Sequence, residues 1–238
     1  MKKVFVVGAS SSIGLAICRK YLDEGWRVLA QFNRHELALL DLAKSSNGRL
    51  TTIRLSFDDP YELEAKLDER LADYIDSDAL ITCAARMEAR SFAELDVSIL
   101  LSHFAINVLP GLLLMRDLAP AMAKRGWGRV VHLGSIGTKF GGGKYNFAYA
   151  LSEHSIEMLP SESRSWSISN VLVNVLRVGV TDTSIHQADL TKNIDDRVAL
   201  IPMKRMADPS EIAAAVWFLG SGNNTYITGQ VISISGGE

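Results

Sequence analysis

The chain has 238 residues, a formal net charge of −2, and a composition that is 47% hydrophobic and 22% charged. These values are typical of a globular protein and are ample for a buried core. The small net charge and the lack of a polybasic run argue against nucleic acid or a membrane surface as a partner.

Short runs rich in β-branched residues alternate with longer segments of helical periodicity. Seven runs are predicted to be strands: residues 2–7, 27–32, 50–56, 78–85, 128–135, 170–178 and 231–235. Helices are expected between them at residues 13–25, 36–44, 61–75, 98–125 and 149–159. This alternation predicts an α/β, doubly wound Rossmann-type fold, with a seven-stranded, mostly parallel sheet and helices on both faces.

No internal repeat, low-complexity tract or linker divides the chain, so we expect one domain over residues 1–238. Residues 183–206 have mixed polarity and no clear periodicity. A segment of this length is either a substrate lid or an ordinary connection with a short helix, and the sequence leaves both open.

Several features point to a cytoplasmic protein. The apolar run near the N-terminus ends after four residues and is too short for a signal peptide. The longest apolar segment, around residues 107–115, is expected to fall far short of a membrane span. Cys18 and Cys83 have no metal-ligand spacing, so we expect no metal site and two reduced thiols.

A glycine- and serine-rich turn follows the first strand and opens the first helix. It reads GASSSIG and comprises Gly8, Ser10, Ser11, Ser12, Ile13 and Gly14 around Ala9. Glycines here let backbone N–H groups approach a pyrophosphate, and the helix N-terminus favours an anion. Such a turn can also merely join two elements. Its position at the first strand–helix junction favours a dinucleotide site.

The end of the second strand bears on the choice between NAD and NADP. An acidic residue here would bind the ribose 2′-hydroxyl of NAD, but the chain reads Gln31-Phe32-Asn33-Arg34. Arg34 is suited to a 2′-phosphate, and Asn33 lies beside it. We therefore expect NADP rather than NAD. The alternative is that Arg34 is a solvated surface arginine.

Several ordered stretches resemble the motifs of one family. They are GASSSIG, ALITCAA, FAINVLPG, VVHLGS followed by Tyr149, NVLRVGVTDT, RMADPSEIAAAVWFL and ITGQVISISGG. Each is weak evidence alone, but their order along the chain is specific. The chain resembles a short-chain dehydrogenase/reductase of the single-domain type over essentially its whole length.

The resemblance implies hydride transfer between nicotinamide and a small carbonyl or alcohol substrate. Tyr149 would donate the proton, Ser135 would hydrogen-bond the same carbonyl oxygen, and Asn107 would organise a water chain. Further implied cofactor contacts are Ser56, Phe57, Cys83, Ala84, Ala85, Gly179, Thr181 and Thr183. A homodimer or homotetramer is also implied.

One departure from the family concerns the catalytic helix. The resemblance implies a lysine four residues after the tyrosine, and the chain has Glu153 there. A carboxylate can accept hydrogen bonds from ribose hydroxyls, but it raises the pKa of Tyr149 where a cation would lower it. Unless Lys139, Lys144 or Arg177 replaces that cation, alcohol oxidation, which needs the phenolate, should suffer more than carbonyl reduction.

Other departures lie along the cofactor site and the catalytic helix. Ser12 replaces the middle glycine of the loop, Ser56 an aspartate near the adenine, and Val178 a proline. Pro160 is expected to interrupt the helix that follows Tyr149, which puts the family's tetramer in doubt. Tyr145 is a weaker candidate for the acid because it lies close after Ser135.

Three functions remain open at this stage. The first is an NADP-dependent oxidoreductase that uses Asn107, Ser135 and Tyr149. The second is a catalytically silent relative that binds a dinucleotide as a sensor or interaction module, an alternative suggested by Glu153 and the altered loop. The third, by analogy of fold alone, is a dehydratase or epimerase that oxidises a sugar transiently.

Overall fold

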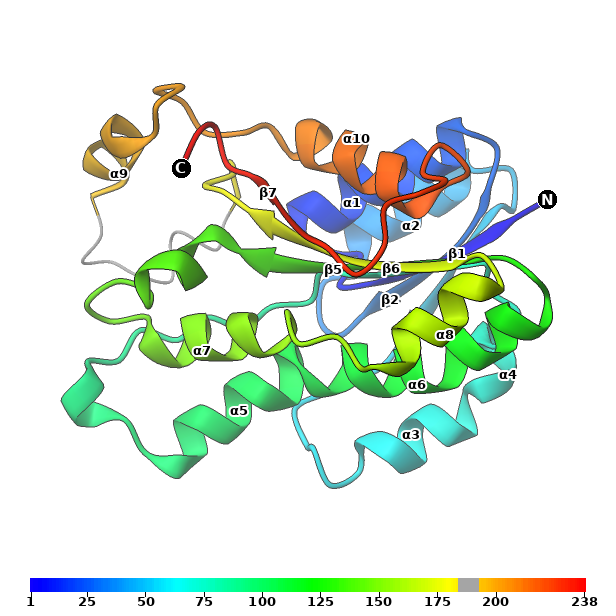
Figure 1. Cartoon of the computed structure of the whole chain (residues 1–238), viewed down its shortest axis with the longest axis horizontal. Helices are drawn as coiled ribbons and strands as arrows, with labels where there is room; N and C mark the ends of the chain where they lie inside the picture. The colour runs from blue at the N-terminus through cyan, green and yellow to red at the C-terminus, as the bar shows by residue number, and fades with distance from the viewer. Residues whose placement is uncertain (184–192) are drawn as a thin grey trace.

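A seven-stranded sheet runs through the middle of the molecule (Figure 1). The structure is a computed structural model that describes residues 1–183 and 193–238. Its strands are β1 (Lys3–Val7), β2 (Arg27–Phe32), β3 (Leu50–Arg54), β4 (Ala79–Thr82), β5 (Gly128–Ser135), β6 (Val171–Val178) and β7 (Val231–Ile234). The order across the sheet is β3-β2-β1-β4-β5-β6-β7, and every pair of neighbouring strands is parallel. The predicted fold class is confirmed.

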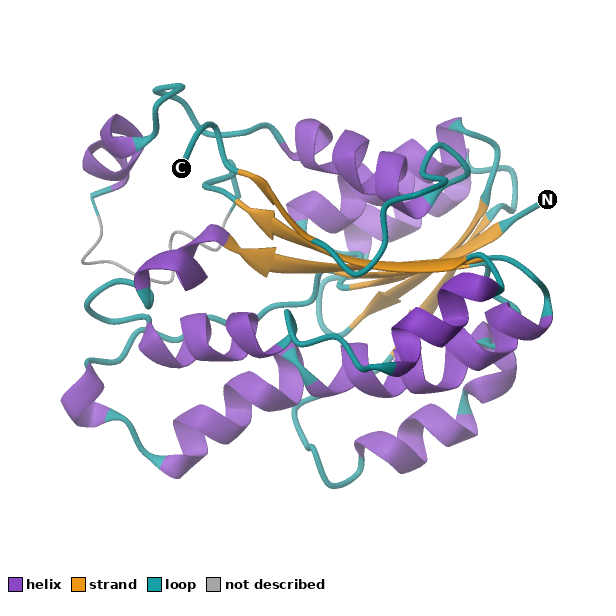
Figure 2. Ribbon diagram, viewed as in Figure 1, coloured by secondary structure: helices purple, strands orange, loops and turns teal. Residues whose placement is uncertain are grey.

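Helices cover both faces of the sheet (Figure 2). One face carries α1 (Ser12–Asp23), α2 (Leu37–Ser45) and α10 (Pro209–Gly220). The other carries α3 (Leu63–Glu69), α4 (Leu71–Tyr74), α5 (Val97–Asn107), α6 (Leu109–Lys124), α7 (Phe147–Ser155) and α8 (Glu162–Ile168). Three short elements lie in connections: the 3₁₀ helices η1 (Phe92–Glu94) and η2 (Ile136–Phe140), and α9 (Ile194–Leu200).

Alternating side chains on each strand explain the two-sided core. On β1, Val4 and Val6 belong to the cluster that packs against α1 and α10, whereas Phe5 and Val7 belong to the cluster on the α6 side. Successive side chains of a strand point to opposite faces, so a strand covered on both faces reads as a continuous apolar run. This is why the strands are clear in the sequence.

Helix ends differ from the expected ones where the backbone is interrupted. The helix predicted over residues 61–75 is divided at Arg70, which has φ −109°. The helix predicted over residues 98–125 is divided at Val108, because Pro110 has no N–H with which to continue it. Beyond Tyr149 the helix ends at Ser155, and α8 begins only after Pro160. The interruption expected at Pro160 is therefore present.

The expectation about membrane spans needs a correction. α5 and α6 follow one another closely, and together they make a 28-residue stretch that is long and apolar enough to cross a membrane by length and composition. The core helix of a globular protein passes the same test, and α6 contributes Leu114, Met115, Leu118 and Met122 to the core. In the sequence this stretch looks shorter, because Pro110 is read as a break in the helix.

The strand order fixes where a ligand can enter. The chain moves outward from β1 to β2 and β3, then returns to place β4 on the other side of β1. The loops that leave β1 and β4 therefore diverge to opposite faces and open a crevice at the carboxyl ends of these strands. In Figure 1 the carboxyl ends of β5, β6 and β7 point to the side of the molecule where η2, α7 and α9 gather.

Candidate active site

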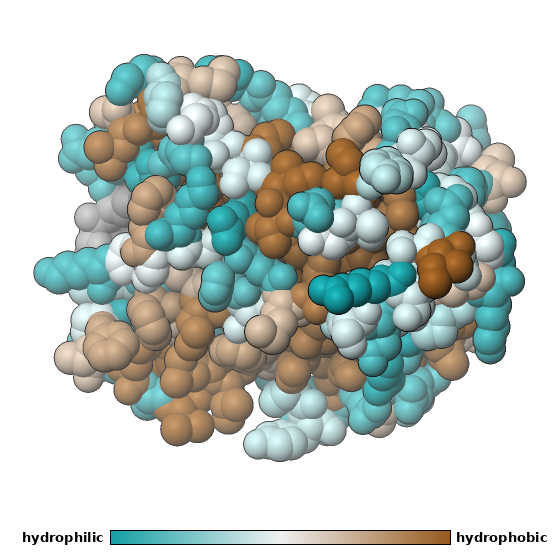
Figure 3. Space-filling view, viewed as in Figure 1, coloured by the Kyte–Doolittle hydropathy of each residue, from teal (hydrophilic) through white to brown (hydrophobic). Residues whose placement is uncertain are grey.

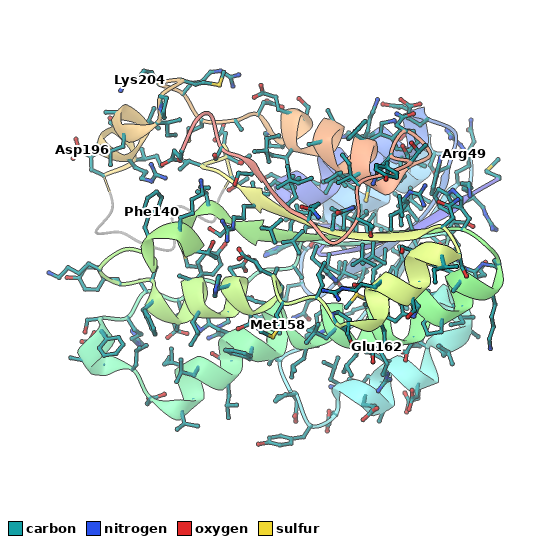
Figure 4. All side chains as sticks on the ribbon, in the orientation of Figure 1. Arg49, Phe140, Met158, Glu162, Asp196 and Lys204 are labelled. Carbon is teal, nitrogen blue, oxygen red and sulfur yellow. The ribbon has the colours of Figure 1, made fainter. Side chains whose placement is uncertain are left out.

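A cleft of about 1910 Å³ opens at the carboxyl ends of the strands. A pocket for one small ligand measures roughly 300–1,000 Å³, so this cleft has room for an extended ligand and a second molecule. Its described lining comes mainly from the loops after β1, β2, β3, β4, β5 and β6, and from η2, α7 and α9. Figure 4 shows Phe140, one of the lining residues, between η2 and α9.

Most of the residues predicted to form the site line this cleft. They are Gly8, Ser10, Ser11, Ser12, Ile13, Asn33, Arg34, Phe57, Cys83, Ala84, Ala85, Ser135, Tyr149, Glu153, Gly179, Thr181 and Thr183. Gly14, Ser56 and Asn107 do not belong to the lining. The structure thus brings the two ends of the predicted site into one cavity.

Two glycines shape the loop between β1 and α1. Gly8 has φ +83°, and a Cβ built there would lie 2.4 Å from the backbone nitrogen of Ala84. A Cβ on Gly14 would lie 2.3 Å from the carbonyl oxygen of Gly8. Ser11 caps α1, because its Oγ accepts the N–H of Gly14 at 3.0 Å and donates to the Gly8 oxygen at 2.9 Å. The result is a tight cradle directly before a helix N-terminus.

A buried glutamine supports this cradle. The Gly8 N–H donates to Oε1 of Gln31 at 2.8 Å, and the Nε2 of Gln31 donates to the carbonyl oxygen of Leu55 at 2.6 Å. Gln31 thus links the loop after β1 to the ends of β2 and β3. The sequence suggested no role for its side chain, because amide bridges between neighbouring strand ends have no sequence signature.

The far end of the cleft lies at the ends of β2 and β3. Arg34 is exposed there, Asn33 is half-buried, and Phe57 is buried with 4% of its surface accessible. Ser56 does not belong to the lining, and its Oγ donates to Asp58 Oδ2 at 2.8 Å. Asp58 also accepts from Asn33 Nδ2 at 3.2 Å and lines the cleft, although it was not predicted.

The segment after β4 forms the cleft wall opposite Gly8. Cys83 donates its thiol hydrogen to the carbonyl oxygen of Val7 at 3.1 Å. Burial raises the pKa of this thiol to about 12, so it stays protonated and unreactive. Thr82 and His132 bond through Oγ1 and Nδ1 at 2.7 Å and join β4 to β5. His132 belongs to the core, where burial lowers its pKa to about 4.

Asn107 braces the wall. Its Oδ1 accepts the N–H of Arg86 at 2.7 Å, and its Nδ2 donates to the Arg86 oxygen at 3.0 Å and to Ser152 Oγ at 2.8 Å. These bonds hold the segment after β4 against α7. The side chain of Asn107 is 7% exposed, and its amide is committed to protein partners.

Ser135 and Tyr149 meet at the end of β5. Ser135 is the last residue of β5, and its Oγ accepts the N–H of Gly137 at 3.1 Å. Tyr149 lies in the first turn of α7 and lines the cleft. Desolvation, followed by the carboxyl group of Glu153, raises the pKa of Tyr149 far above its usual value, and a hydrogen bond with Ser135 offsets only part of this. The phenol is therefore neutral throughout the physiological range.

Glu153 is buried one helical turn beyond Tyr149, with 3% of its surface accessible. Desolvation and the neighbouring charge of Glu157 raise the pKa of Glu153 to about 8. At neutral pH the group is therefore mostly a protonated acid that can donate a hydrogen bond. Sequence spacing predicted its position, but its protonation follows from burial, which the sequence does not display.

Glu157 is the charged partner in this pair of acids. Burial opposes its ionisation, but two hydrogen bonds from Arg177, both 2.6 Å long, together with the charge of Arg177 and a bond from Thr138, lower the pKa of Glu157 below its usual value. His154 Nδ1 lies 3.0 Å from the same carboxylate. Neither Glu157 nor this use of Arg177 was predicted from the sequence.

The cations considered as replacements for a lysine have other partners. Arg177 is paired with Glu157, Lys139 donates to the carbonyl oxygen of Glu238 at 2.9 Å, and the Lys144 ammonium lies 5.1 Å from the ring centroid of Tyr145. None of the three contributes to the shifted pKa of Tyr149. The pKa of Tyr149 is set by burial, by Glu153 and by the hydrogen bond with Ser135.

The segment after β6 closes the last side of the cleft. A Cβ on Gly179 would lie 2.6 Å from Ser235 Cα, so only glycine lets the chain pass β7 here. Thr181 Oγ1 donates to the Gly179 oxygen at 3.1 Å, and Thr183 Oγ1 donates to the Thr181 oxygen at 3.3 Å. Both threonines line the cleft.

The predicted lid at residues 183–206 is described only in part. Residues 184–192, which include His186, lie outside the described residues. After them, α9 is joined to the end of the chain by an ion pair between Arg197 and Glu238. Leu200 and Pro202 also line the cleft. The role of this segment as a lid remains a prediction.

Comparison with known proteins defines the class. Residues 8–238 match a family model described as enoyl-(acyl carrier protein) reductase. The acetoacetyl-CoA reductase of Allochromatium vinosum is 27% identical, over 98% of this chain and 96% of that protein. The 3-oxoacyl-[acyl-carrier-protein] reductase of Escherichia coli is 29% identical, over 99% of this chain and 96% of that protein.

Solved structures agree with these relatives. A 3-oxoacyl (acyl-carrier-protein) reductase from Agrobacterium tumefaciens with NADP bound has a TM-score of 0.87 and 25% identity, covering 100% of this chain and 94% of that one. A short-chain dehydrogenase/reductase family protein has a TM-score of 0.86 and 25% identity, covering 99% and 96%. The fold and cleft are thus those of a nicotinamide-dependent oxidoreductase. The chain belongs to the short-chain dehydrogenase/reductase family.

Proposed function

We propose that this protein is an NADPH-dependent carbonyl reductase in which Tyr149 donates the proton. The observation that carries the proposal is the neutral phenol of Tyr149 beside the Ser135 hydroxyl, in a cleft that begins at a glycine cradle. A hydroxyl pair on one side of a substrate carbonyl can orient its oxygen and give it a proton.

The residues of the cleft suit a nicotinamide dinucleotide. Gly8 and Gly14 allow the close backbone packing that forms this tight turn, and the turn can hold a pyrophosphate against the backbone of Ser11 and Ser12 and the N-terminus of α1. When bound, the dinucleotide supplies the hydride. Cys83, Ala84 and Ala85 would flank it on the β4 side, and Gly179, Thr181 and Thr183 on the β6 side.

We assign the adenosine end to Asn33, Arg34 and Phe57. Arg34 has no acidic residue before it on β2, and its guanidinium is exposed in the cleft, where a 2′-phosphate can compete with Asp58 for it. This supports NADPH over NADH. A dissociation constant for NADH equal to or tighter than that for NADPH would contradict the preference.

Glu153 stands where the family resemblance implies a lysine, and we propose that it keeps only part of the lysine's role. Its protonated carboxyl group can exchange hydrogen bonds with ribose hydroxyls and so position a nucleotide. It does not provide a positive charge to stabilise a phenolate. We assign Asn107 a structural role, because its hydrogen bonds fix α7 to the segment after β4.

This tuning favours one direction of reaction. In reduction, Tyr149 acts from its neutral form, and the carbonyl oxygen becomes basic as hydride reaches the carbon. In oxidation, Tyr149 would have to act as phenolate, which its raised pKa opposes. We therefore infer that the enzyme reduces carbonyls faster than it oxidises the corresponding alcohols at neutral pH.

The residues that line the cleft and the activities of the related proteins together suggest a substrate class. On the side of η2 and α9 the lining includes an apolar and aromatic set, Phe140, Tyr145, Leu200 and Pro202, beside the charged residues Lys144, Arg197 and Glu238. This set suits a carbonyl compound with an apolar chain. Acetoacetyl-CoA is therefore the first probe, because reductases of this thioester are among the relatives.

The test compares Tyr149→Phe with Tyr145→Phe, since both tyrosines line the cleft. We expect the first change to lower kcat for acetoacetyl-CoA reduction by about 10²–10⁴-fold, the usual contribution of a positioned acid. The second should change kcat by less than about fivefold, because Tyr145 lies outside the proposed proton transfer. The reverse pattern would transfer the role to Tyr145. NADPH binding without turnover of any carbonyl would favour the silent alternative.

A further inference from the structure

A carboxylate that the family resemblance does not account for stands at the adenosine end of the cleft. Asp58 follows β3 by four residues and lines the cleft together with Asn33 and Arg34. Its Oδ2 accepts hydrogen bonds from Ser56 Oγ at 2.8 Å and from Asn33 Nδ2 at 3.2 Å. Two side chains therefore fix the carboxylate beside the residues assigned to the ribose.

The same oxygen faces the arginine assigned to the 2′-phosphate. Arg34 Nη2 lies 3.7 Å from Asp58 Oδ2, and the two side chains are 72% and 41% exposed. The charge of Arg86, which also lines the cleft, acts on this carboxylate as well. The hydrogen bond from Ser56 is the main cause that holds the pKa of Asp58 below its usual value, so the group is ionised at neutral pH.

We propose that Asp58 is a specificity-determining residue that opposes the 2′-phosphate of NADP(H) and so narrows the preference for NADP(H) over NAD(H). The proposal rests on the dinucleotide site of the proposed function. Asp58 weakens phosphate binding in two ways. Its negative charge repels the 2′-phosphate, and its carboxylate competes with the phosphate for the guanidinium of Arg34. A 2′-hydroxyl is neutral and meets neither obstacle.

The effect should be moderate because solvent reaches the pair. Screening weakens interactions between exposed charges. The ligand carries close to two negative charges at its 2′-phosphate, by analogy with other phosphate monoesters near neutral pH. Removing the charge of Asp58 should therefore raise the affinity for a 2′-phosphorylated ligand by about three- to tenfold, and added salt should reduce this gain in affinity.

The experiment is calorimetric titration of the wild type, Asp58→Asn and Asp59→Asn with NADPH, NADH, adenosine 2′,5′-bisphosphate and 5′-AMP. The asparagine at 58 keeps the shape and removes the charge. Asp59→Asn is the matched control, because it makes the same change in net charge one residue away. The carboxylate of Asp59 accepts the N–H of Tyr61 at 2.9 Å, and Asp59 does not line the cleft.

We expect Asp58→Asn to lower the dissociation constants of NADPH and of the bisphosphate by about three- to tenfold. The dissociation constants of NADH and AMP should stay within about twofold of the wild-type values. Asp59→Asn should leave all four ligands within that same range. Equal tightening of NADPH and NADH, or no change for either, overturns the role of Asp58 while the dinucleotide site stands. If the wild type binds neither dinucleotide, the proposed function fails, and this inference fails with it.

Discussion

Glu153 and Glu157 are two acids one helical turn apart in buried surroundings, and they differ in charge. Glu157 has Arg177 and Thr138 as partners and is ionised, while Glu153 is held in its protonated form by burial and by the charge of Glu157. Two carboxyl groups this close seldom ionise together. A carboxyl group beside Tyr149 is thus compatible with an acid catalyst, because it is neutral when the enzyme works.

The raised pKa of Glu153 predicts how stability depends on pH. The native chain keeps this proton up to about pH 8, whereas the unfolded chain loses it near the usual value of 4.5. The unfolded state therefore binds fewer protons between these values, and stability falls as pH rises, by at most about 1.4 kcal/mol per pH unit from this group. Urea unfolding from pH 5 to pH 8 should show the decline in the wild type and a flatter profile in Glu153→Gln.

The control for this series is Glu162→Gln, since Glu162 is an exposed glutamate on α8 (Figure 4). It should keep the slope of the wild type. A wild-type slope that survives in Glu153→Gln would show that Glu153 is already ionised in the native protein, and the account of Tyr149 would need another basis.

Placing a cation at this position should change the direction of catalysis. In Glu153→Lys the ammonium would lower the pKa of Tyr149, so alcohol oxidation at pH 7 to 8 should rise by about tenfold or more, whereas reduction should change less. Initial rates in both directions measure this, and Glu153→Gln separates the added charge from the lost carboxyl group. A matching loss of both rates would place the carboxyl group in the mechanism.

At the scale of elements, the loop between β1 and α1 depends on its second glycine. The Cβ of Gly14→Ala would meet the backbone oxygen of Gly8 at 2.3 Å, so the cradle must shift. We expect NADPH affinity to fall by about tenfold or more, the equivalent of about 1.4 kcal/mol. Gly222→Ala is the control, because a Cβ there meets nothing within 4 Å. Unchanged binding by Gly14→Ala would show that the pyrophosphate lies elsewhere.

Sequence patterns predicted the elements that have one strong local cause. The seven strands follow from apolar runs, the tight loop between β1 and α1 from its glycines, and the break after α7 from Pro160. What the patterns did not show is how side chains from separate elements meet. The pairing of Arg177 on β6 with Glu157 after α7, and of Asp58 with Arg34, depends on the folded chain.

The same distinction applies within the candidate site. Motif order placed Ser135 and Tyr149 correctly in one cleft, because spacing along β5 and α7 is local. It could not show that Glu153 is a neutral acid, nor that the amide of Asn107 is already bonded to Arg86 and Ser152. Protonation and hydrogen-bond partners are set by burial and tertiary contacts.

At the scale of the whole molecule, a group of large apolar side chains is exposed to solvent. Phe92, Val97, Leu101, Leu151 and Met158 are 69%, 71%, 46%, 37% and 82% exposed. Figure 3 shows apolar side chains gathered over η1, α5 and α7. Apolar side chains gathered in this way mark an interaction surface. We infer that it is covered by a second copy, as the predicted homodimer or homotetramer requires.

The oligomer prediction is tested by Val97→Glu and Leu101→Glu together, measured by light scattering after gel filtration. The wild type should have at least twice the mass of one chain, and the double variant should shift toward one chain. Ile168→Glu is the control, because Ile168 is 88% exposed on α8, away from this surface. A wild type that is monomeric at micromolar concentration would remove the inference.

The claim on which the whole account depends is that the cleft binds a nicotinamide dinucleotide, with NADPH preferred. Calorimetric titration of the wild type tests it most directly, since none of the four tryptophans is among the described residues that line the cleft. The account predicts one saturable site per chain, with NADPH bound more tightly than NADH. Binding of neither would contradict both the reductase and the silent dinucleotide-binding relative.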